Sequence, residues 1–189
     1  MTTKNNSKDI LIETASRLFR MRGYYGVGLK DIIEESGIPK GSLYHYFPNG
    51  KEQLAIEAIN HTKDIVINEI QELFDAYEDP IEAFQTHLEH LSKIIVNSDN
   101  IGFPIGTIAG ETHSTNEPIR IACRLAFKEW QSIYTTKLLQ SGYNKKQSTD
   151  LSLVINVMIE GAILISLTNK SNKPIQVIKS QIPLLLRKE

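Results

Sequence analysis

Apolar residues recur three and four positions apart along almost the whole chain, which has 189 residues. Side chains at this spacing lie on one face of an α-helix, whereas a half-buried strand needs a two-residue alternation that no stretch of this sequence sustains. The pattern therefore predicts an all-helical protein of about nine helices. Three of these helices fall within residues 1–50, and the others fall within residues 51–189.

The first predicted helix runs from Ser7 to Arg22. Serine is a favourable N-cap, and Gly23 is a favourable stop because glycine readily adopts the left-handed conformation beyond a last helical turn. The apolar face of this helix consists of Leu11, Ala15, Leu18 and Phe19. The residues expected on its solvent side are Arg17, Arg20 and Arg22.

The next two predicted helices are short and adjacent. One runs from Leu29 to Gly37, with Asp31 in its first turn, where the helix dipole favours an anion. The other runs from Lys40 to Phe47. Two helices of about two turns joined by a tight glycine-containing turn form the helix-turn-helix pattern.

Helical spacing divides the side chains of GIPKGSLYHYF, residues 37–47, into two faces. Leu43 and Phe47 are four positions apart, so we expect them to pack against the two preceding helices. The outward residues offer a cation, hydroxyls, an imidazole and a glycine, which suits contact with the phosphates and base edges of double-stranded DNA. They are Lys40, Gly41, Ser42, Tyr44 and His45. Tyr46 lies between the faces, and both packing and contact stay open for it.

The body is predicted to contain long helices over about residues 50–77, 80–96, 116–141, 148–168 and 174–188. The stretch 101–113 holds three glycines and a proline, so it is at best a short or kinked helix. Lys51 opens the first long helix, where free backbone N–H groups can bind a phosphate. Ser148 is expected to cap the helix that follows it.

Composition indicates an ordinary globular protein, because 41% of residues are hydrophobic and 23% are charged. The single Cys123 excludes an intramolecular disulfide and a cysteine-rich zinc site, and it suits a reducing cytoplasm. The first residues, MTTKNNSKD, lack the apolar core of a secretion signal. We therefore expect a cytoplasmic protein.

Charge is distributed unevenly along the chain. Residues 1–51 carry eight Lys and Arg against five Asp and Glu, a net charge of +3, whereas the other 138 residues carry thirteen against seventeen, a net charge of -4. A basic head on an acidic body suits an anionic polymer bound at one end. Chance unevenness in a nearly neutral chain is the alternative.

Residues 151–167, LSLVINVMIEGAILISL, form the most apolar stretch. They are short for a membrane span and are interrupted by Asn156 and Glu160, so we expect a buried or subunit-facing helix and no membrane association. A monomer would expose a large apolar surface here, so the last two helices are the predicted homodimer interface. Asn156 and Glu160 either fix the register of that interface or line a pocket, and we place Glu160 beside the pocket.

Residues 31–54, DIIEESGIPKGSLYHYFPNGKEQL, resemble the DNA-binding head of the TetR family of bacterial transcriptional regulators. The shared pattern is a glycine-aromatic pair, a short helix, GxLYxxF and a lysine-glutamate pair, and the resemblance covers about 45 residues from Leu11 to Leu54. It implies a three-helix head, a helical regulatory body and homodimers that release an operator when a small ligand binds. Val27 and Gly28 depart from the pattern, because the family prefers threonine or serine there.

The body segments GFPIGTIAGE, FKEW, EGAIL and KPIQ resemble a narrower subgroup, which includes LmrA-type repressors of drug-efflux genes and their flavonoid-responsive relatives. Phe103 stands where this subgroup often has cysteine, and Leu167 stands where arginine is common. Residues 1–50 are thus the expected helix-turn-helix DNA-binding domain, and residues 51–189 the expected ligand-binding and dimerisation domain.

The predicted function is a ligand-responsive repressor that binds double-stranded operator DNA. Gly41 and Ser42 are expected nearest the base edges. The residues expected at the DNA backbone are Lys40, Tyr44, His45 and Lys51. A transcriptional activator and a ligand-independent DNA binder are alternatives with the same head.

Aromatic residues and helix breaks coincide in the body, where they predict a cavity for an apolar or aromatic inducer. Its polar contact comes from Tyr134 or His87. An ordinary buried core would show the same spacing, so that alternative has equal weight. The candidate lining residues are Phe103, Pro104, Ile105, Phe127, Trp130, Tyr134 and His87.

A metal-dependent helical enzyme is the rival class. His87 and His90 are three apart on one helical face, and Glu111 and His113 are predicted in a loop. The sequence contains no HExxH or ExxH pair and no nucleophile elbow. We therefore expect no enzyme activity, no metal and no cofactor.

Overall fold

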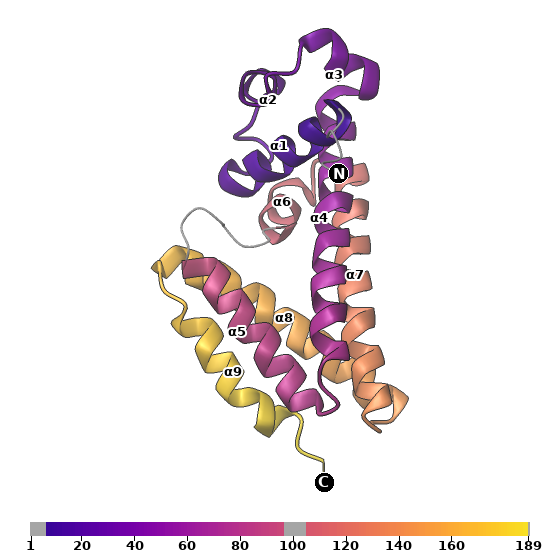
Figure 1. Ribbon diagram of the computed structural model, residues 1–189, viewed down its shortest axis with the longest axis vertical. Coiled ribbons are helices and arrows are strands. Elements are labelled where there is room, and N and C mark those ends of the chain that lie inside the picture. Colours follow the sequence, from indigo (N-terminus) through magenta and orange to yellow (C-terminus); the bar gives the residue numbers. More distant parts are fainter. Residues whose placement is uncertain (1–6, 97–104, 189) are drawn as a thin grey trace, which may run out of the picture. The chain divides into compact units, whose positions relative to one another are not determined.

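The structure, a computed structural model, describes residues 7–96 and 105–188, and these residues form nine α-helices and no strand (Figure 1). The all-helical prediction is confirmed. The helices are α1 (Ser7–Arg22), α2 (Leu29–Ser36), α3 (Lys40–Tyr46), α4 (Gly50–Asp75), α5 (Pro80–Val96), α6 (Ile105–Thr112), α7 (Glu117–Gln140), α8 (Lys145–Asn169) and α9 (Lys173–Leu185).

The chain forms two compact units. The first comprises the described residues of 1–64 and 105–126, and the second comprises those of 65–104 and 127–189. Helices α4 and α7 therefore contribute residues to both units. Because the first unit includes α6, it is larger than the DNA-binding domain expected at residues 1–50, and that functional boundary stays a prediction.

Helix α1 has the predicted bounds and the predicted buried face. Its four expected apolar residues, Leu11, Ala15, Leu18 and Phe19, are all at most 1% exposed. Gly23 ends the helix with a φ of +72°, and its N–H donates to the Phe19 carbonyl at 2.9 Å. Of the three arginines expected on the solvent side, Arg22 is exposed and Arg17 and Arg20 are partly exposed, and partial burial lowers the pKa of the Arg20 guanidinium.

Helices α2 and α3 form the helix-turn-helix. The Asp31 carboxylate accepts the N–H of the N-cap Gly28 at 2.7 Å, so the acid expected near the dipole also closes the start of α2. Gly37 ends α2 with a φ of +67°. Helix α3 has seven residues, too few for a stable isolated helix. Leu43 and Phe47 hold it in place, because both are fully buried.

Helix α8 begins earlier than expected. Its N-cap is Asn144, whose side chain accepts the Gln147 N–H at 2.9 Å while the Gln147 side chain accepts the Asn144 N–H at 3.1 Å. This reciprocal capping box satisfies two free backbone donors at once, whereas a serine cap satisfies one. Ser148, the predicted cap, is therefore an internal residue of the helix and is fully buried.

Helix α8 packs against α9 and α5 in the second unit (Figure 1). Among the described helices it alone is long and apolar enough to cross a membrane, with a mean hydropathy of 2.0 over its most apolar stretch. One side of α8 is buried through Ile155, Ile159 and Ile163. Its other side leaves large apolar side chains at least 42% exposed, and these are Leu153, Val154, Val157, Leu164 and Ile165.

Candidate DNA-binding and effector sites

The predicted DNA-contact residues of α3 lie on its solvent side. Lys40, Gly41, Tyr44 and His45 are exposed, and Ser42 is partly exposed. The Lys40 ammonium lies 5.8 Å from the centre of the Tyr44 ring, one helical turn away. The structure thus brings five predicted residues together on one short helix whose opposite side is anchored in the core. Tyr46, which the sequence left open, is half-buried.

Lys51 occupies a different environment. Its ammonium lies 4.1 Å from the centre of the Tyr24 ring, so a cation-π contact holds it against the aromatic pair before α2. Partial burial lowers the pKa of Lys51, whereas the nearby carboxylates of Glu111 and Asp31 favour the charged form. Lys51 is therefore a cation fixed within the first unit.

Several other basic side chains of the first unit are paired with acids. Arg17 contacts Glu35 at 2.6 Å, and Lys30 contacts Glu34 at 3.6 Å. Lys40 has no ion-pair partner among the described residues. A phosphate that approached Lys40 would therefore not compete with a protein carboxylate.

Two of the predicted effector residues form a buried pair in the second unit. The His87 Nε2 and the Tyr134 hydroxyl are 3.0 Å apart, and both side chains are at most 4% exposed. The rings of Phe74 and Phe84 pack around Tyr134, with centroids 5.9 and 5.3 Å away. We call His87, Tyr134, Phe74 and Phe84 the aromatic cluster.

His87 has one unsatisfied nitrogen in this cluster. Its Nδ1 is buried and has no hydrogen-bond partner among the described residues. Burial lowers the pKa of His87 to about 3, and the neighbouring His90 acts in the same direction, so the imidazole is neutral at physiological pH. A polar atom that reached Nδ1 would satisfy a group that is otherwise costly to bury.

Glu160 lies beside the same cluster. Burial raises the pKa of Tyr134, and the Glu160 carboxylate raises it further, which places this residue of α8 within electrostatic reach of the tyrosine hydroxyl. Burial also raises the pKa of Glu160 to about 7. Tyr134 therefore contributes a neutral hydroxyl to an aromatic environment, and the half-buried Glu160 carboxyl changes its charge near neutral pH.

The other predicted lining residues are distributed differently. Phe127 and Trp130 pack edge to face with ring centroids 5.7 Å apart, and Trp130 is buried. Ile105 opens α6 in the first unit, where it lies beside α1 and is 1% exposed. Phe103 and Pro104 lie outside the described residues.

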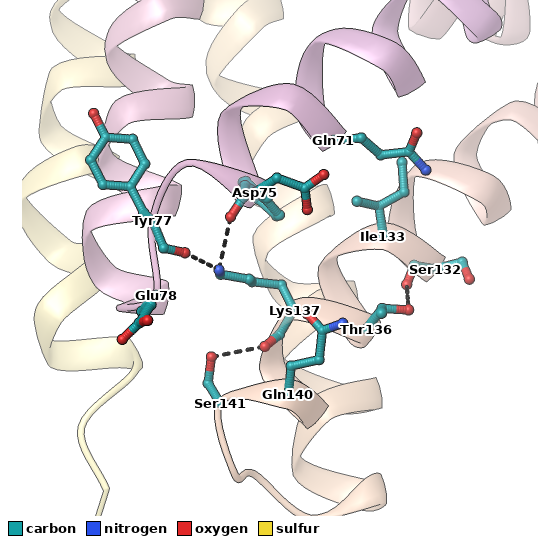
Figure 2. A pocket seen from close by; sticks show the side chains of 11 residues that line it. Gln71, Asp75, Tyr77, Glu78, Ser132, Ile133, Thr136, Lys137, Gln140 and Ser141 are labelled. Carbon is teal, nitrogen blue, oxygen red and sulfur yellow. Dashed lines mark hydrogen bonds between the residues drawn. The ribbon is translucent and has the colours of Figure 1, made fainter.

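A pocket that the sequence did not indicate lies between the ends of α4 and α7 (Figure 2). It measures about 670 Å³, a volume in the range of small-molecule sites, and polar side chains form most of its wall. Lys137 is 8% exposed and donates to the Phe74 carbonyl at 2.9 Å and also to the Tyr77 carbonyl. It thus joins the last turn of α4 to the segment that follows it.

The residues considered for a metal site do not converge on one point among the described residues. His90 lies 3.9 Å from the Glu69 carboxylate, and the His113 Nδ1 lies 2.8 Å from the Gly110 carbonyl. Glu111 is in the last turn of α6, where it accepts the Tyr25 N–H, so its predicted placement in a loop is wrong. Among residues 7–96 and 105–188, no group of three or more His, Cys, Asp and Glu side chains could hold a metal ion.

Two family models match the chain. One, described as bacterial regulatory proteins of the tetR family, matches residues 11–58, which contain the helix-turn-helix. The other, described as the C-terminal domain of LmrA/YxaF-like transcriptional regulators, matches residues 80–181. The chain belongs to the TetR family. It is therefore an HTH-type transcriptional regulator, and the family binds operator DNA.

Two relatives from Bacillus subtilis (strain 168) match over nearly their whole length. The HTH-type transcriptional regulator YxaF is 45% identical and covers 100% of both chains, and the HTH-type transcriptional regulator LmrA is 47% identical over 97% of this chain and 98% of its own. The predicted LmrA-type subgroup is confirmed. These relatives and the family are transcriptional regulators, a class distinct from enzymes.

Solved structures show the same fold. A TetR regulator from Legionella pneumophila has a TM-score of 0.88 at 21% identity, and it covers 99% of this chain and 100% of its own. The reduced form of NemR from E. coli has a TM-score of 0.86 at 17% identity, with 98% and 100% covered.

The protonation of Glu160 predicts how stability depends on pH. The folded chain keeps the Glu160 proton up to about pH 7, whereas the unfolded chain loses it near pH 4.5, so the folded state binds more protons between these values. The free energy of unfolding of the wild type should therefore fall relative to that of Glu160→Gln as pH rises through this window. We expect a relative loss of at least about 1 kcal/mol between about pH 5 and about pH 8, measured by urea unfolding.

The control is Glu72→Gln, which changes an exposed carboxylate of α4. Its unfolding free energy should differ from that of the wild type by the same amount at both pH values. His87 is present in all three proteins, so its own titration cancels in each comparison. A difference between wild type and Glu160→Gln that did not vary with pH would contradict the burial of Glu160 beside the aromatic cluster.

Proposed function

We propose that the chain is a cytoplasmic, homodimeric repressor that leaves a near-palindromic operator when a small, largely apolar or aromatic inducer binds. The observation that supports this most directly is the exposed face of α3, which is anchored by Leu43 and Phe47. In a dimer, two such helices enter successive major grooves about 34 Å apart.

Each residue of the α3 face has a proposed role in binding DNA. Lys40, Tyr44 and His45 contact the phosphate backbone, with Lys51 beside them at the start of α4. Gly41 and Ser42 lie nearest the base edges. A Cβ added at Gly41 would meet no atom within 4 Å, so the backbone there is open to a close approach by the duplex.

Replacement of Lys40 by alanine should weaken binding to every DNA sequence by a similar factor. Because each phosphate contact releases counterions, the slope of log affinity against log salt concentration should fall by about one. The measurement is fluorescence anisotropy with promoter fragments from the chain's own locus, at several salt concentrations. Lys146→Ala, which changes an exposed lysine of α8 paired with Asp150, should leave the slope unchanged. An unchanged slope in Lys40→Ala would remove Lys40 from the interface.

The proposed dimer interface is formed by α8 and α9. Along α8, Leu153, Val157 and Leu164 lie on one exposed stripe at helical spacing, and the exposed Val177 and Leu184 continue the apolar surface on α9. A groove of about 710 Å³ separates the two helices and has a mainly apolar lining. Packing against the same two helices of a second copy would bury this surface, as in a four-helix bundle.

Replacement of Leu164 by aspartate should convert the dimer to a monomer, because a charge would be buried at the centre of the interface. Light scattering coupled to size-exclusion chromatography measures the mass directly. Leu139→Asp is the control, since Leu139 is an exposed leucine of α7 in the same unit. A Leu164→Asp protein that kept the mass of two chains would contradict the proposed interface.

The proposed inducer site is centred on the aromatic cluster. The inducer places its apolar part among the aromatic rings, and Tyr134 or His87 supplies its polar contact. An inducer must bind the DNA-releasing conformation more tightly than the DNA-binding one, because equal affinity for both would shift nothing. Helix α4 is the proposed connection, since it starts at Gly50 next to the α3 segment and ends at Asp75, where Lys137 donates to the Phe74 carbonyl.

A compound that releases the promoter fragment should change the fluorescence of Trp130, which is the single tryptophan of the chain. In His87→Leu, the concentration of that compound needed for release should rise about fivefold or more, because a hydrogen-bonding group is lost. Affinity for DNA without the compound should stay unchanged. His90→Leu, one turn along α5, is the control. A wild-type protein whose Trp130 fluorescence ignored every active inducer would contradict the site.

A further inference from the structure

The last turn of α6 touches the corner between α1 and α2. We define the corner as residues 23–28. The Glu111 carboxylate accepts the backbone N–H of Tyr25 at 3.1 Å, across 86 positions of sequence. The Tyr25 hydroxyl lies 2.6 Å from the hydroxyl of Thr115, just beyond α6. The segment 111–115 therefore holds the corner in two ways, through the backbone and through the side chain of Tyr25.

Gly23 makes room for this contact. A Cβ at Gly23 would lie 1.9 Å from the Glu111 carboxylate, far inside van der Waals distance. The glycine also has a φ of +72°, a conformation that other residues rarely adopt. The close approach of Glu111 to the corner thus depends on the same residue that ends α1.

The position of Glu111 is unfavourable for α6 itself. A carboxylate in the last turn of a helix faces the negative end of the helix dipole. Two groups of the first unit offset this cost: the Lys51 ammonium attracts the carboxylate electrostatically, and the Tyr25 N–H donates to it. Glu111 is thus stabilised by the corner and by Lys51 at the start of α4, and not by its own helix.

A second polar contact joins the same segment to α4. Asn116 donates to the Glu52 carboxylate at 2.7 Å and also accepts the Ile119 N–H at 2.9 Å, so it caps α7 while it binds the first turn of α4. In addition, Ile105 and Ile108 of α6 lie beside Phe19 of α1 and Ile59 of α4. Helix α6 is therefore bound to α1, to the corner and to α4 within one compact unit.

We propose that Glu111 is a positioning residue that couples α6 to the DNA-binding face by holding the α1–α2 corner through the Tyr25 amide. The corner joins α1 to α2, and α1 packs against both α2 and α3. By thermodynamic reciprocity, DNA bound at α3 then stabilises α6, and disorder in α6 weakens DNA binding. This coupling rests on the DNA-binding part of the proposed function and is independent of the inducer.

The test is hydrogen exchange of the wild type, Glu111→Ala and Glu111→Gln, with and without a promoter fragment. In the wild type, DNA should slow exchange of the α6 amides, and it should not do so in Glu111→Ala. In the free protein, the Tyr25 amide of Glu111→Ala should exchange about fivefold faster or more, because its acceptor is lost. Glu111→Gln should restore both effects in large part, because an amide oxygen accepts the same hydrogen bond.

Glu117→Ala is the matched control, since Glu117 is an exposed glutamate nearby that pairs with Arg120. It should behave as the wild type does. Exchange in α6 that ignored DNA in the wild type, or that responded equally in Glu111→Ala, would overturn the coupling. A wild-type protein that bound no promoter fragment would instead contradict the DNA-binding function, and the Tyr25 exchange of the free variants would still show whether Glu111 holds the corner.

Discussion

The burial of Leu43 and Phe47 is the interaction on which the DNA-binding face depends. A helix of seven residues does not persist in water, so α3 depends on the burial of these two side chains and on its packing against α1. Each fully buried side chain contributes about 2 kcal/mol toward the cost of ordering a short helix that carries a glycine at its second position. The opposite side of α3 is therefore free to present polar groups.

Local signals in the sequence predicted this part of the structure well. The bounds of α1 follow from an apolar stripe and from Gly23, and the helix-turn-helix follows from Gly37 and from the spacing of Leu43 and Phe47. Each of these signals acts over a few residues and needs no partner from elsewhere in the chain. The start of α8 was missed because two plausible caps lie close together, and the reciprocal bonds of Asn144 and Gln147 decide between them.

Long-range polar contacts could not be predicted in the same way. Lys137 occupies a helical stripe beside Tyr134, and nothing in its neighbours indicates that its ammonium reaches the end of α4. Glu111 was expected in a loop because glycines surround it, yet the apolar residues of 105–112 form a helix and carry it to Tyr25. In both cases the partner is a backbone group, which the sequence does not distinguish from any other.

The central claim is that α3 reads operator DNA through the face opposite Leu43 and Phe47. The most direct measurement is an NMR map of backbone amide shifts in the deuterated protein on addition of a promoter fragment. The account predicts that the largest changes fall at Lys40, Gly41, Ser42, Tyr44 and His45, with smaller ones at the start of α4. Changes concentrated on other helices, with the amides of α3 left in place, would contradict it.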